Sequence, residues 1–167
     1  MAADGPSGLS VDLPDLAAVA RLGQAIAAAL RPGDVVALSG PLGAGKTTLA
    51  RAIIAALGHE GEVPSPSFAI VEPYAPPQVR LPVVHADFYR LRAPEEAEEL
   101  GLDDYRDGAV LIAEWPEHAG GFAHEPGCLN LTFAPFDESG EQSPASPRRV
   151  LVEPGTLWLS RLTWVTT

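Results

Sequence analysis

Residues 40–48 read Gly-Pro-Leu-Gly-Ala-Gly-Lys-Thr-Thr and combine the residue types that bind phosphate. Gly40, Gly45, Lys46 and Thr47 satisfy the pattern G-x-x-x-x-G-K-[ST] of a phosphate-binding loop, or P-loop. Glycine lets several backbone N–H groups converge on an anion, and the first turn of a following helix adds more. The pattern predicts a nucleotide site in which Lys46 reaches the β- and γ-phosphates and the Thr47 hydroxyl binds Mg²⁺.

The flanking stretches come in the order that a P-loop requires. Residues 34–39 predict an apolar strand and residues 49–57 a helix. Of the eleven Lys and Arg residues in the chain, Lys46 is the only lysine. This indicates a need for a compact cation that the planar guanidinium of arginine does not meet. We expect nucleotide contacts from Gly43, Ala44, Gly45, Lys46, Thr47 and Thr48.

Two acidic residues follow strand-like stretches further along the chain. Residues 79–86 predict a strand that delivers Asp87, and the apolar run 109–113 predicts a buried parallel strand that delivers Glu114. A carboxylate at such a strand end lies beside the P-loop, where it can hold Mg²⁺ or orient an attacking water. We assign the metal to Glu114, because its strand is the purer apolar run, and a second part, catalytic or metal-linked, to Asp87. A carboxylate that only caps the next turn is the alternative for either.

The whole pattern predicts an α/β P-loop NTPase fold, with a mostly parallel central sheet, an antiparallel strand pair near residues 67–86 and helices on both faces. Residues 156–165 are apolar but ambiguous between helix and strand. The other expected elements are a helix over 13–30 capped by Asp15, a strand over 68–71, a short acidic helix from Pro94 to Gly101, and strands over 128–133 and 148–153.

Length and composition favour one domain over residues 1–167, with a flexible start at 1–12 and a mobile loop at 137–147. Every apolar run stops short of the roughly 18 residues of a membrane span, and the N-terminus has no basic stretch of a signal peptide. The single cysteine, Cys128, excludes an internal disulfide, and we expect it in the core of a cytoplasmic protein.

Taken together, the motifs resemble one family, the bacterial tRNA threonylcarbamoyladenosine biosynthesis ATPases of the TsaE (YjeE) type. The resemblance covers most of residues 13–120, in order and at the family's spacing. The stretches that carry it are the P-loop, Ser65-Pro-Ser-Phe68, Val71-Glu-Pro-Tyr74, His85-Ala-Asp-Phe-Tyr-Arg-Leu91, Glu98-Glu-Leu-Gly-Leu102 with Asp104-Tyr105, and Ile112-Ala-Glu-Trp-Pro-Glu117.

The resemblance implies an ATPase that acts on the threonylcarbamoyl transferase and its dimerising paralogue during formation of N6-threonylcarbamoyladenosine (t6A) on ANN-decoding tRNAs. It also implies that Thr47 and Glu114 bind Mg²⁺ and that Asp87 is needed for activity. ATP is favoured over GTP because the guanine-reading N-K-x-D motif needs a second lysine. The proline-bracketed segment from Ser65 to Ser67 is a candidate sensor of the γ-phosphate; a stiff connector is the alternative.

Two other functions fit the same motifs. A small-molecule P-loop kinase would need a lid of arginines, for which Arg90, Arg92 and Arg106 are candidates. A nucleotide-binding regulatory module would turn over negligibly by itself. The measurement that separates these is phosphate release from ATP, with and without the transferase proteins.

The charge of the chain predicts that it does not hold tRNA by itself. The net charge is -11, and no basic cluster exceeds the pair Arg148-Arg149, so most of the counterion release that drives nucleic-acid binding is missing. In a filter-binding titration, tRNA should be retained only when the transferase proteins are present. Tight, salt-sensitive retention by the isolated chain would contradict this prediction.

Overall fold

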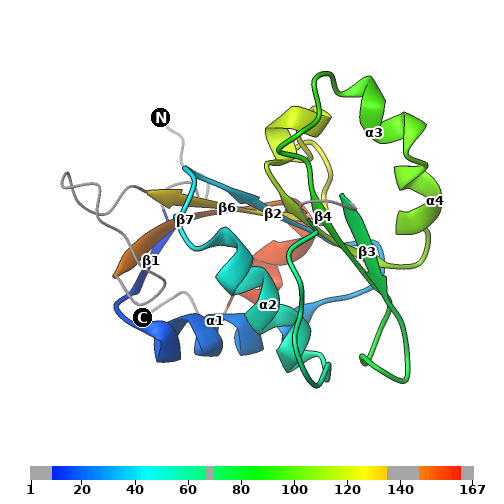
Figure 1. Ribbon diagram of the computed structural model, residues 1–167. Coiled ribbons are helices and arrows are strands. Elements are labelled where there is room, and N and C mark those ends of the chain that lie inside the picture. The colour runs from blue at the N-terminus through cyan, green and yellow to red at the C-terminus, as the bar shows by residue number, and fades with distance from the viewer. Residues whose placement is uncertain (1–8, 67–69, 135–146, 163–167) are drawn as a thin grey trace.

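Within residues 9–66, 70–134 and 147–162, which the computed structural model describes, seven strands form one mixed sheet in the order β1-β7-β6-β2-β5-β4-β3 (Figure 1). The strands are β1 Leu9–Leu13, β2 Val35–Ser39, β3 Val71–Tyr74, β4 Val83–Asp87, β5 Val110–Glu114, β6 Cys128–Ala134 and β7 Arg148–Pro154. The helices are α1 Leu16–Ala29, α2 Lys46–Ala56, α3 Glu95–Glu99 and α4 Leu102–Arg106, with short 3-10 helices η1 Pro116–Ala119 and η2 Thr156–Arg161.

The four central strands, β6, β2, β5 and β4, are parallel. Successive side chains of β2 and β5 point to opposite faces of the sheet, and both faces are covered. Val36 and Ile112 belong to the core cluster under α1 and α2, while Val35 and Leu111 belong to the cluster under α3 and α4. Continuous apolar runs are typical of strands covered on both sides. The predicted fold class is thereby confirmed (Figure 1).

Both edges of the sheet are antiparallel. The expected pair near residues 67–86 is β3 with β4, although β3 begins at Val71 and β4 at Val83, later than predicted. Residues 67–69 lie outside the described residues. At the other edge, β7 is antiparallel to β6, and β1 is antiparallel to β7. Residues 9–12, the described part of the stretch predicted as a flexible start, belong to β1, for which β7 supplies the backbone partners.

One face of the sheet is covered by α1 and α2, which lie side by side (Figure 1). As predicted, Asp15 caps α1, its side chain accepting from the Ala18 N–H at 2.9 Å. Gly23 lies where the two helices meet. A Cβ at this position would stand 2.7 Å from Ala52 Cβ, closer than real side chains approach, so glycine sets the distance between α1 and α2.

The other face carries α3 and α4 (Figure 1). The predicted acidic helix is α3, and a second helix follows it because Gly101 turns the chain in a left-handed conformation, with φ of 79°. Cys128 is 1% exposed, as expected of a core residue, and burial raises the pKa of its thiol to about 12.

The C-terminal part of the chain follows β6. Its ambiguous stretch forms the 3-10 helix η2 over residues 156–161, and the predicted mobile loop at 137–147 falls outside the described residues except for Pro147. None of the helices in the described ranges is long and apolar enough to span a bilayer.

Replacing Gly23 by alanine should lower the free energy of unfolding by about 1–3 kcal/mol, the usual cost of overpacking. Alanine favours a helix more than glycine does, so the destabilisation would come from the contact with Ala52 rather than from helix propensity. Urea denaturation measures the effect. The exposed Ala20→Gly on the same helix is the control for propensity and should cost about 1 kcal/mol. A Gly23→Ala protein more stable than the wild type would contradict the packing argument.

Candidate nucleotide-binding site

The P-loop connects the end of β2 to the start of α2, and its glycines have conformations that other residues rarely adopt. Gly45 has φ of 109° and directly precedes α2, and Gly40 has φ of 138°. A Cβ on Gly40 would lie 2.8 Å from the Phe133 carbonyl oxygen of β6. The loop therefore packs closely against β6. This contact orients the start of α2 at the carboxyl edge of the sheet.

Lys46 is the first residue of α2 and is 5% exposed. Its Nζ donates to the carbonyl oxygens of Gly40 at 2.7 Å and Pro41 at 2.8 Å, so the side chain curls back into its own loop. The ammonium also lies 4.5 Å from the centroid of the Trp115 ring. Burial lowers the pKa of Lys46, and nearby carboxylates, Glu114 first, act in the opposite direction.

Thr47, Glu114 and His85 form a chain of hydrogen bonds that is part-buried at Thr47 and buried at His85. The Thr47 hydroxyl donates to Glu114 Oε1 at 2.6 Å, and His85 Nε2 lies 2.7 Å from Glu114 Oε2. Since a carboxylate has only acceptors, the imidazole donates from Nε2. Glu114 is 2% exposed and His85 is fully buried, so both carboxylate oxygens are held in position. His85 had no site role in the sequence-based prediction.

Asp87 is the register partner of Glu114 on the adjacent parallel strand. Its Oδ1 accepts from the Tyr89 N–H at 3.0 Å. Burial raises the pKa of Asp87; the hydrogen bond from Tyr89 acts against this, and the like charge of Glu114 reinforces it. The two competing strand ends therefore deliver their carboxylates to the same edge of the sheet, beside the P-loop helix.

Aromatic residues border the site and were assigned no role from the sequence. Trp115 follows Glu114 with a positive φ of 55°, and its ring centroid lies 4.9 Å from that of Tyr89 and 5.3 Å from that of His118. His118 Nδ1 lies 3.0 Å from the Tyr89 carbonyl oxygen. A local sequence signal could have found Trp115. A tryptophan and a proline directly after a strand-end carboxylate indicate a sharp turn beside the P-loop.

The proline-bracketed segment lies next to α2. Arg51 of that helix donates to the Val63 carbonyl oxygen at 2.8 Å, and the Ile70 N–H donates to the Pro66 carbonyl at 2.7 Å. The Asp87 N–H in turn donates to the Ile70 carbonyl at 2.9 Å. The described end of the segment is thus tied to the strand that carries Asp87, while Ser67 lies outside the described residues.

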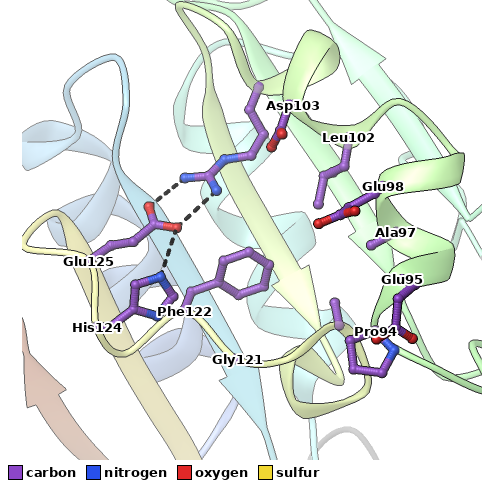
Figure 2. Close-up of a pocket in the computed structure, with 12 residues that line it drawn as sticks. Pro94, Glu95, Ala97, Glu98, Leu102, Asp103, Gly121, Phe122, His124 and Glu125 are labelled. Atoms are coloured by element: carbon purple, nitrogen blue, oxygen red, sulfur yellow. Dashed lines mark hydrogen bonds and ion pairs between the residues drawn. The ribbon is translucent and has the colours of Figure 1, made fainter.

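Arg106, one of the three arginines considered for a kinase lid, is engaged elsewhere. Its guanidinium makes a two-pronged contact with Glu125, at 2.6 and 3.0 Å, and lies over the Phe122 ring. These residues line a cavity of about 240 Å³ together with residues of α3 and α4 (Figure 2). Glu125 raises the pKa of Arg106, and Arg106 lowers that of Glu125. This pair stabilises the far side of the domain rather than the P-loop.

The geometry suits a cation that is shared with phosphate oxygens rather than enclosed by protein. In the described parts of the chain, no group of three or more His, Cys, Asp or Glu side chains is arranged to hold a metal. Mg²⁺ differs from zinc in this respect, because it is usually bound by one or two protein oxygens, with water and phosphate completing its shell. The Thr47 hydroxyl and the Glu114 carboxylate are two such oxygens in direct contact.

Comparison with known proteins identifies the family. The model of the family "Threonylcarbamoyl adenosine biosynthesis protein TsaE" matches residues 13–142. The chain belongs to the TsaE family. The family acts in the biosynthesis of threonylcarbamoyladenosine in tRNA, and the resemblance seen in the sequence is thereby confirmed.

Relatives named tRNA threonylcarbamoyladenosine biosynthesis protein TsaE match much of the chain. The protein of Streptomyces coelicolor is 45% identical over 97 residues, which are 58% of this chain and 66% of that protein. The Haemophilus influenzae protein is 37% identical over 123 residues, 70% of this chain and 77% of that one. The crystal structure of YdiB from Bacillus subtilis superposes with a TM-score of 0.71 at 25% identity, covering 95% of this chain and 93% of that chain.

Replacing Asp87 by asparagine should increase the free energy of unfolding at pH 7.5, because the amide keeps an acceptor for the Tyr89 N–H and removes a charge that burial disfavours. The raised pKa sets the sign of the pH dependence. The contribution of Asp87 to the free energy of unfolding is most favourable below its ordinary pKa of 3.8. This contribution is lost as the pH rises through the raised pKa of the folded state. The advantage of the variant should therefore shrink in urea titrations as the pH falls from 7.5 through the raised pKa of Asp87. The exposed Asp103→Asn is the control, and an equal pH dependence in both variants would contradict the prediction.

Proposed function

We propose that this protein is a Mg²⁺-dependent ATPase that acts on the threonylcarbamoyl transferase and its dimerising paralogue in t6A formation. The observation that carries the proposal is the contact of Thr47 with Glu114 beside Lys46, in a P-loop of a TsaE-family chain. A P-loop threonine bonded to the carboxylate of a neighbouring strand is the arrangement that NTPases use around the phosphates and their cation.

Binding begins with the loop and the first turn of α2. The backbone N–H groups of Gly43, Ala44, Gly45, Lys46, Thr47 and Thr48 supply donors, and the helix N-terminus favours negative charge. Lys46 exchanges the carbonyl oxygens of Gly40 and Pro41 for phosphate oxygens. Its burial below Trp115 keeps water away and strengthens that attraction.

Thr47 and Glu114 would hold the metal in this proposal. Bound Mg²⁺ would supply positive charge to offset the negative charge that develops on the phosphates during transfer. His85 positions Glu114 by occupying Oε2, which leaves Oε1 directed at Thr47 and the cation site. A residue that hydrogen-bonds to a metal-binding side chain orients that side chain and tunes its affinity for the metal.

Asp87 is proposed to orient the attacking water. It lies one strand away from Glu114, and the burial that raises its pKa brings the carboxylate closer to the working range of a general base. Its backbone is hydrogen-bonded to Ile70, at the end of the segment that contains Ser65 and Ser67. A change in that segment on loss of the γ-phosphate would therefore reach both Asp87 and a bound partner.

Two alternatives are less well supported. A kinase lid would draw on Arg106, which is committed to Glu125. A purely regulatory module would need neither the second carboxylate, Asp87, nor the positioned Glu114. A protein partner is favoured over direct contact with tRNA because the net charge is -11.

Lys46→Ala should abolish phosphate release from Mg·ATP, both alone and with the transferase proteins, because it removes the only cation built into the loop. Wild-type protein should release phosphate, and the transferase proteins should accelerate it. Arg149→Ala is the matched control, since it removes one unit charge from an exposed pair with Asp12 and should leave turnover unchanged. Unchanged turnover of Lys46→Ala would overturn the ATPase assignment, and wild-type binding of ATP without turnover under either condition would favour the regulatory module.

A further inference from the structure

Arg148 is the first residue of β7 and reaches the P-loop from two strands away, because β6 lies between β7 and β2 in the sheet. It is 3% exposed, which is unusual for an arginine. Its Nε donates to the Ala44 carbonyl oxygen at 2.6 Å, and its Nη2 donates to the Gly43 carbonyl oxygen at 3.1 Å. One guanidinium thus holds two consecutive peptide groups of the loop, 104 residues away in sequence.

These contacts determine where the loop N–H groups point. In a trans peptide the C=O and N–H bonds are antiparallel across the plane of the unit. When the Ala44 carbonyl is held toward Arg148, the Gly45 N–H of the same unit is directed to the opposite side. The proposed phosphate site lies at the start of α2, which this peptide unit directly precedes.

The peptide groups at this point need such a restraint. Gly43 and Gly45 flank the held units with φ of 76° and 109°, and glycine has no Cβ to oppose rotation of its neighbouring peptide planes. A loop built from glycine can approach an anion closely, but it does not by itself favour one orientation of its N–H groups. The planar fork of arginine is suited to fixing two acceptors at once, which a single ammonium does less well.

We propose that Arg148 is a positioning residue for nucleotide binding: it holds the Gly43 and Ala44 carbonyls so that the Gly45 N–H faces the phosphates before nucleotide arrives. The inference rests on the proposed function, because it concerns the same phosphate site. It also gives the C-terminal strand a direct part in that site.

A purely structural arginine is available in the same chain for comparison. Arg161 is also buried, with its side chain 6% exposed, and donates to Asp34 at 2.7 Å and to the Ala29 carbonyl at 3.1 Å. Asp34 precedes β2, whereas the P-loop follows β2. The two arginines therefore have similar burial and similar carbonyl contacts, but they lie toward opposite ends of the strand that leads into the loop.

The test compares Arg148→Met with Arg161→Met, because methionine fills much of the buried volume without a donor. Calorimetric titration with Mg·ADP, which avoids turnover, is carried out well below the melting temperature of each variant. Loss of a charged hydrogen-bond donor should weaken Mg·ADP binding about ten- to a hundredfold in Arg148→Met. Arg161→Met should lose thermal stability but keep its affinity within about twofold, as expected of a site outside the loop.

A second readout follows the loop itself. In ¹H–¹⁵N spectra of the nucleotide-free protein, the Gly45 amide resonance should shift or broaden in Arg148→Met and stay in place in Arg161→Met. Arg148→Lys keeps the charge but not the fork, so about tenfold weaker binding is expected even if the methionine variant does not fold.

Wild-type affinity for Mg·ADP in Arg148→Met or in Arg148→Lys would overturn the proposal and leave Arg148 as a structural residue. Equal losses of affinity in the Arg148 and Arg161 variants would do the same. If the wild-type protein itself bound no Mg·ADP, the proposed function would fail and the role of Arg148 would fall with it. That result is distinguishable, because it appears before any variant is compared.

Discussion

The hydrogen bond between Thr47 and Glu114 joins the two halves of the candidate site. Thr47 stands in the first turn of α2, and Glu114 ends β5. The bond is available only because β5 lies next to β2, in parallel, with Glu114 in register with Leu38, just before the P-loop. Strand order, rather than the loop sequence, therefore decides which carboxylate meets the P-loop threonine.

A second feature of the site is its concentration of buried polar and charged groups in an acidic protein. Lys46, Arg148, Glu114 and His85 are all at most 5% exposed. Burying such groups is unfavourable unless each is hydrogen-bonded. Here the loop carbonyls, the Thr47 hydroxyl and the Glu114 carboxylate give each residue at least one partner, and His85 Nδ1 is the buried atom left without one. The cost of burying these groups is offset by their hydrogen bonds, which also hold the cations and donors in position around the P-loop.

The aromatic residues beside the site are positioned by the backbone conformation of the turns that carry them. Trp115 has a positive φ, which is uncommon outside glycine, and this conformation brings its ring over the Lys46 ammonium. Strained backbone of this kind is concentrated at functional sites. Tyr89 packs against the same ring and donates its backbone N–H to Asp87, so the turn after β4 contributes both to the aromatic cluster and to the position of the second carboxylate.

The sequence by itself determined the features that depend on near neighbours. The P-loop, the Asp15 cap of α1 and the apolar run of β5 were predictable because glycine spacing, capping and periodicity act within a few residues. The fold class followed from the order of these elements, and the family from the resemblance that the motifs of residues 13–120 carry.

Only the tertiary structure decided the long-range contacts. The strand β1 was missed because its partner, β7, lies at the other end of the chain, and β-pairing depends on that partner more than on local propensity. His85 and Arg148 carried no local signal of a site role. His85 meets Glu114 across 29 residues, and Arg148 meets Ala44 across 104. The order of strands in the sheet brings each pair together, and no spacing along the sequence encodes that order.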